Sequence, residues 1–157
     1  MKKFIYLLLT IGLIYNCSDD DDTSNTEVSG CTDIQATNYN ANANSDDGTC
    51  LYSIVGDWTV TEYTLSDGTD ILAAYDYIDY TLYSDNSFIQ SFRVTGTTDE
   101  LIVTGTYSIG GSNNSSITYI VDGSATVATI LSVSYTNMSL NFDVDSTTTA
   151  YMELVRI

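Results

Sequence analysis

Eight short segments of β type occupy the C-terminal part of the chain and strongly limit its fold. Each segment is rich in Val, Ile, Thr, Tyr and Phe, and its apolar and polar residues alternate, which is typical of strands with one buried face. Turn-forming residues separate neighbouring segments, and none of these connections has room for a crossover helix. The expected strands are residues 54–63, 77–83, 88–94, 101–109, 117–121, 125–134, 138–144 and 149–156.

The connections between these segments predict an antiparallel meander. Residues 84–87 form a four-residue hairpin loop, and Asp122-Gly123 is a typical two-residue hairpin turn. The piece 70–76 is ambiguous, because its apolar spacing also fits one or two helical turns. A meander of eight strands loses its unpaired edges by closing on itself. The predicted fold of residues 51–157 is therefore all-β, a small antiparallel eight-stranded up-and-down barrel.

The N-terminus has the pattern of a signal peptide, which we assign to residues 1–16. Lys2 and Lys3 precede an apolar run of about eleven residues, which is shorter than the roughly 20 residues of a membrane-spanning helix. Cys17 follows, and then a run of four aspartates. This junction resembles the lipobox and surface-export signal of Bacteroidetes lipoproteins. The resemblance implies acylation of Cys17 and a lipid-anchored, surface-exposed position on the outer membrane. The alternative is a secreted protein with an unmodified cysteine.

The charge and the missing histidine exclude several function classes. The net charge is −17, so nucleic acid and anionic membranes would repel the chain, and membrane attachment would depend on the lipid. Without histidine, Ser-His-Asp and Cys-His catalysis and the usual zinc sites are not available. Carboxylate pairs such as Asp76 and Asp79 are better explained as solvated strand positions than as a glycosidase pair. We therefore do not expect an enzyme.

Two further regions precede the barrel. Residues 17–30 are polar and acidic without periodicity, which predicts a flexible tether after the acylated cysteine. Residues 31–50 lie between Cys31 and Cys50, an even pair once Cys17 carries lipid, and an exported chain favours their disulfide. The spacing within this segment resembles a small cysteine-bounded module of secreted Bacteroidetes proteins, which implies no particular activity.

The 31–50 module is also rich in side-chain oxygens, which are the ligands that Ca²⁺ prefers. The spacing does not match an EF-hand, since Asp47 stands where the glycine would be. Two interpretations stay open, a Ca²⁺ site and a loop in which Asn and Asp simply form turns. The candidate ligands are Asp33, Asn38, Asn40, Asp46 and Asp47.

Several short motifs of the C-terminal region resemble the lipocalin-like domains of Bacteroidetes lipoproteins. They are Gly56-x-Trp58 on the first strand, SDNSF at 84–88, GTYSI at 105–109 and ELVR at 153–156. The resemblance implies a barrel with capacity for a small hydrophobic ligand. It also implies that Trp58 packs at the closed end near Arg156.

The aromatic residues on the inward faces are the candidate lining of such a barrel. They are Trp58, Phe88, Phe92, Tyr107 and Phe142. One hypothesis is a carrier that holds a small hydrophobic ligand among them. The alternative is a structural or interaction protein of a surface assembly, in which the same side chains merely fill the barrel and no ligand binds.

Overall fold

The structure is a computed structural model that describes residues 26–157. The predicted signal peptide, the predicted lipidation site Cys17 and the aspartate run lie outside the described residues. Within residues 26–157, no helix is long and apolar enough to cross a membrane.

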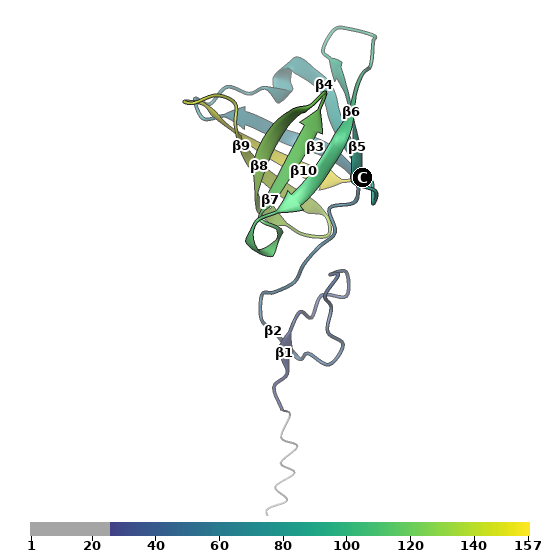
Figure 1. Cartoon of the computed structure of the whole chain (residues 1–157), viewed down its shortest axis with the longest axis vertical. Helices are drawn as coiled ribbons and strands as arrows, with labels where there is room; N and C mark the ends of the chain where they lie inside the picture. The colour runs from purple at the N-terminus through teal and green to yellow at the C-terminus, as the bar shows by residue number, and fades with distance from the viewer. Residues whose placement is uncertain (1–25) are drawn as a thin grey trace, which may run out of the picture.

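Eight antiparallel strands close into one barrel, as Figure 1 shows, which confirms the predicted fold class. Each strand pairs with its neighbour in sequence, and the last strand pairs with the first to complete the ring. Alternate residues of each strand point inward, so the apolar residues form the core and the polar residues between them face the solvent. The strands are β3 (Gly56–Leu65), β4 (Tyr75–Leu82), β5 (Ser87–Val94), β6 (Leu101–Gly110), β7 (Ser116–Val121), β8 (Ser124–Val133), β9 (Asn137–Asp143) and β10 (Thr149–Arg156).

The hairpin turns follow from local backbone chemistry. Asp122 and Gly123 both have positive φ, at 50° and 80°, which is the conformation that a two-residue turn between twisted strands requires. Glycine adopts it without a steric cost, and aspartate is among the residues that tolerate it best. The turn therefore fixes the pairing of Val121 with Ser124 and the register of β7 and β8.

The ambiguous piece before β4 contains one turn of 3₁₀ helix, η1 (Leu72–Ala74), and then continues directly into the strand. Two backbone hydrogen bonds hold this connection to its neighbours. The amide of Ile71 donates to the carbonyl of Tyr63 on β3, and the amide of Thr95 donates to the carbonyl of Ala74. Leu72 and Tyr75 pack against the barrel core. A second 3₁₀ turn, η2 (Ser112–Asn114), joins β6 and β7.

A small N-terminal module precedes the barrel and lies at the end where the chain enters it (Figure 1). The disulfide between Cys31 and Cys50 closes this module, with Cα atoms 4.8 Å apart, as the sequence predicts. Two short parallel strands, β1 (Ser29–Gly30) and β2 (Ser45–Asp46), pair inside it. Residues 28–30, which the sequence places in the tether, are thus hydrogen-bonded to the module.

Candidate ligand-binding cavity

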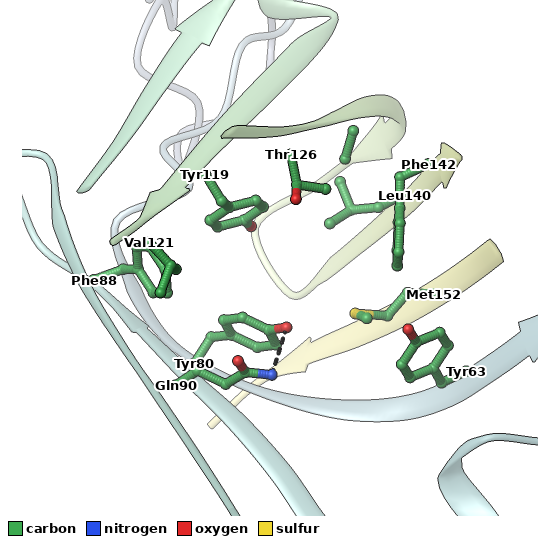
Figure 2. A pocket seen from close by; sticks show the side chains of 11 residues that line it. Tyr63, Tyr80, Phe88, Gln90, Tyr119, Val121, Thr126, Leu140, Phe142 and Met152 are labelled. Atoms are coloured by element: carbon green, nitrogen blue, oxygen red, sulfur yellow. Dashed lines mark hydrogen bonds between the residues drawn. The ribbon is translucent and has the colours of Figure 1, made fainter. Parts of the chain in front are cut away.

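The half of the barrel nearest the connections after β3, β5, β7 and β9, called the open half below, contains a cavity of about 210 Å³. Its lining residues come from seven of the eight barrel strands. Figure 2 shows their aromatic rings, aliphatic groups and polar groups directed into one space. The lining residues are Tyr63, Tyr80, Phe88, Gln90, Tyr119, Val121, Thr126, Ala128, Leu140, Phe142 and Met152.

Strand alternation explains why two of the lining tyrosines face inward. On β4, Tyr80 lies between the buried residues Ile78 and Leu82, two positions from each. On β7, Tyr119 lies two residues after the fully buried Ile117. Successive side chains of a strand point to opposite faces, so each tyrosine must enter the barrel with its neighbours.

The polar groups of the cavity are hydroxyls and one amide. The amide nitrogen of Gln90 donates a hydrogen bond to the Tyr80 hydroxyl at 2.9 Å (Figure 2). Within residues 26–157, no protein group pairs with the hydroxyls of Tyr63 and Tyr119. Those two hydroxyls are available to a bound molecule.

Burial keeps the tyrosines of the cavity in their protonated form. Desolvation raises the pKa of Tyr80 and of Tyr119 far above the ordinary value, and it also raises the pKa of Tyr63. Neighbouring phenols add to the effect, since Tyr63 raises the pKa of Tyr80 and Tyr80 raises that of Tyr119. All three are therefore hydrogen-bond donors throughout the physiological pH range.

Edge-to-face contacts between rings shape the wall of the cavity. Phe88 and Tyr119 meet at a centroid distance of 5.2 Å and an interplanar angle of 78°, the preferred geometry for aromatic pairs. Gly105 on β6 makes room for this pair, because a Cβ atom there would lie 2.7 Å from a ring carbon of Phe88. The glycine thus lets the Phe88 ring lie against the β6 backbone.

The closed half of the barrel forms the floor beneath the cavity. Trp58 is fully buried there, and its indole nitrogen donates to the carbonyl of Ile54 at 2.8 Å. The Arg156 guanidinium lies 4.3 Å from the centroid of the Trp58 ring, a cation–π contact that matches the pairing implied by the sequence resemblance.

Arg156 also binds the chain segments around it. Its three guanidinium nitrogens donate to the backbone carbonyls of Tyr135, Val55 and Ser53, at 2.6, 2.7 and 2.7 Å. A side chain at Gly56 would collide with this guanidinium, because a Cβ would lie 2.3 Å from one of its nitrogens. Arg156 therefore closes the floor and is not directed into the cavity.

The five aromatic residues proposed from sequence divide between these regions. Phe88 and Phe142 line the cavity. Trp58 belongs to the floor, and Tyr107 lies near it, with its hydroxyl bonded to the carbonyl of Tyr83 at 2.7 Å. Phe92 packs edge-on against Tyr75 at 5.6 Å.

Sequence reasoning did not name the other nine lining residues. Two of them, Tyr80 and Tyr119, lie in the same alternation as the apolar residues that were used to define the strands. That alternation would have placed them inward. Gln90 also lies in that alternation, between Phe88 and Phe92, so its position on the strand predicts that it faces inward although it is polar.

Tyr63 is the exception, because it alternates oppositely to Trp58 and Val60. It turns inward at a register shift in the pairing of β3 with β10, between Val60 and Glu62.

The candidate calcium ligands of the module use their oxygens in local hydrogen bonds. Asp33 accepts from the amide of Gln35 and from the Tyr52 hydroxyl, and Asp47 accepts from the amide and hydroxyl of Thr49. Hydrogen bonds from these partners lower the pKa of both aspartates.

The other three candidates behave in the same way. Asn38 bridges to the backbone of Thr49 and Leu51, Asn40 accepts from the amide of Asn42, and Asp46 accepts from the amide of Gly48. Among residues 26–157, no three His, Cys, Asp or Glu side chains gather in a metal-binding cluster. Calcium binding by this module stays a prediction from sequence.

Comparison with known proteins finds only distant similarity. No protein-family model matches it, and no curated protein matches it significantly. Among solved structures, a bovine odorant binding protein (a deswapped triple mutant) is 14% identical, with a TM-score of 0.41 over 65% of this chain and 72% of that one.

A second similar structure is the siderocalin Ex-FABP, which its description says functions through dual ligand specificities. It is 12% identical, with a TM-score of 0.42 and the same coverage of both chains. At these identities and scores, the likeness carries no inference about a ligand of this chain.

Proposed function

We propose that this protein is a small-molecule binding protein whose ligand occupies the cavity in the open half of the barrel. The cavity itself is the observation that supports this. An eight-stranded barrel has an interior just wide enough for side chains or one small ligand, and here the interior is filled only at the closed end. A few polar groups inside a predominantly apolar cavity are typical of a ligand site.

The alternative, a surface-assembly subunit with a barrel filled by side chains, requires an interior without space for a ligand. A cavity of about 210 Å³ is larger than the roughly 150 Å³ that accommodates benzene in an engineered protein. The volume therefore favours the carrier hypothesis. It does not bear on whether the outer surface also contacts another protein.

We further propose that the barrel is carried by a lipid on Cys17 at the outer membrane of a bacterium related to the Bacteroidetes. The support is the sequence junction at Cys17. Because the chain enters the barrel at its closed end, an N-terminal anchor would leave the mouth of the cavity directed away from the membrane. Mass spectrometry of the N-terminal peptide from membranes should find an acylated cysteine, and an unmodified, uncleaved N-terminus would contradict this.

Native mass spectrometry after gentle extraction tests the carrier function. We expect one small molecule per chain. The variant Ala128→Leu should lose it, since Ala128 is 1% exposed and faces the cavity. The matched control is Ala125→Leu, an exposed position on the same strand, which should keep the ligand. If the parent protein retains no ligand and small aromatic probes do not bind it, the carrier function is wrong.

A further inference from the structure

The distribution of charge around the cavity defines the class of ligand. Residues 26–157 contain two cationic side chains, Arg93 and Arg156, and neither lines the cavity. Arg156 is engaged in the floor, as described above. Arg93 pairs with Asp76 at 2.7 Å and lies over the Tyr77 ring on the outside of the barrel. A buried anion would thus lose its hydration without gaining a counter-charge, which is strongly unfavourable.

The mouth of the cavity adds a second barrier to anions. Carboxylates occupy the connections that surround the open end, after β3, β5, β7 and β9, and no lysine or arginine lies in those connections. Coulomb repulsion from this rim would lower the local concentration of an anionic ligand. The carboxylates in these connections are Asp67, Asp70, Asp99, Glu100, Asp122 and Asp145, and Asp143 ends β9 at the same rim.

The acidic rim attracts cations to the mouth, but the interior of the cavity disfavours them. The lining contains no aspartate or glutamate, so an ammonium group inside the cavity would have only neutral oxygens and ring faces as partners. The energetic cost of removing a charge from water exceeds what such partners usually return.

The neutral polar groups then specify what the ligand carries. Tyr63 and Tyr119 present free hydroxyls that stay protonated, and the Tyr80 hydroxyl accepts from Gln90 and keeps its own proton for donation. Donors arranged in this way favour a ligand with an acceptor oxygen, such as a carbonyl, an ether or an alcohol. The aromatic walls and a volume slightly above that of a benzene-binding cavity favour a single ring.

From these observations we propose that the cavity selects uncharged, one-ring compounds that carry a hydrogen-bond acceptor, and that it rejects carboxylates and amines of the same size. This proposal rests on the small-molecule binding function proposed above. The proposal specifies the chemical class of the ligand. The experiment below distinguishes a wrong class from a protein that binds no small molecule.

The test uses four probes that differ little in shape: benzamide, benzoate, benzylamine and toluene. Their affinities for the purified protein are measured at pH 7 by NMR titration. We expect benzamide to bind best and toluene about five-fold more weakly, because it lacks one hydrogen bond. Benzoate and benzylamine should bind at least about ten-fold more weakly than benzamide, since their charges have no partner in the cavity.

Variants assign the selectivity to particular groups. Tyr119→Phe removes one cavity hydroxyl and should weaken benzamide binding about five-fold while leaving toluene unchanged. Tyr77→Phe is the matched control, because the Tyr77 hydroxyl bonds Glu100 on the outer face. Gln90→Met should likewise reduce the preference for benzamide over toluene, and thermal melting checks that each variant is folded.

The outcomes distinguish the two proposals. If benzoate or benzylamine binds as tightly as benzamide, the proposed class is wrong while the binding function stands. Equal affinity for toluene and benzamide would also overturn the class, because the hydroxyls would then contribute nothing. If none of the four probes binds, and Ala128→Leu changes nothing, the binding function itself is wrong.

Discussion

The two halves of the barrel use the same strands for different purposes. In the closed half, Trp58, Met138 and Leu154 are almost completely buried and pack without space for a ligand. In the open half, the same strands place Tyr63, Leu140 and Met152 around a cavity. The difference is one of packing along the barrel axis: one half is filled by side chains, and the other half leaves a cavity.

The largest expected effect is that of Trp58→Ala in the closed half. Truncating a buried tryptophan costs about 3–5 kcal/mol, through lost transfer energy and the cavity left behind. The matched change in the open half, Phe142→Ala, should cost clearly less, because Phe142 is only partly buried and already borders an empty space. Urea unfolding measures both. Equal losses of stability in the two variants would contradict the distinction between the filled half and the half that contains the cavity.

Arg156→Met should destabilise the floor by about 2 kcal/mol, because three carbonyl acceptors lose a charged donor. The control is Arg93→Met on the outer surface, where a solvent-exposed ion pair contributes little. Chemical unfolding of both variants gives the comparison. If Arg93→Met loses as much stability as Arg156→Met, the floor contacts of Arg156 contribute no more than a surface ion pair.

Gly105→Ala tests the wall of the cavity in the open half. A Cβ at this position would lie 2.2 Å from the carbonyl oxygen of Ile120 and 2.7 Å from the Phe88 ring, and such overpacking costs about 1–3 kcal/mol. Gly110→Ala on the same strand should be nearly neutral, since its Cβ would meet only the Ser116 hydroxyl at 3.3 Å. Thermal melting reports stability, and benzamide titration reports the cavity. Unchanged stability and binding in Gly105→Ala would mean that the Phe88 ring and the Ile120 backbone shift at little cost to make room for the methyl group.

The smallest effect appears only at alkaline pH and belongs to the open half. Burial raises the pKa of Tyr80 and Tyr119, so the folded state keeps both protonated while the unfolded chain ionises them near pH 10. Their contribution to stability is therefore complete below about pH 10 and is lost as the pH rises further. Tyr119→Phe should make that loss shallower, as measured by urea unfolding at pH 8 and pH 11. An unchanged slope would indicate that Tyr119 is accessible to hydroxide in the folded state.

The sequence alone determined the strands, the turns and the disulfide. Alternation located all eight barrel strands, Asp122-Gly123 marked a hairpin through its backbone preference, and Cys31 and Cys50 formed the only pair left after Cys17. These features follow from local chemistry, which a sequence pattern carries directly. Only the piece 70–76 stayed undecided, because one turn of 3₁₀ helix is too short to produce a periodicity.

The tertiary structure alone decided where the cavity lies and which side chains line it. Alternation states that Trp58, Phe88 and Phe142 face inward, but it does not give their height along the barrel axis. That height depends on strand tilt and on the registers that closure imposes, including the pairing of β10 with β3. Closure places Trp58 in the floor and Phe142 at the cavity, and it brings Gln90 to Tyr80 from a neighbouring strand.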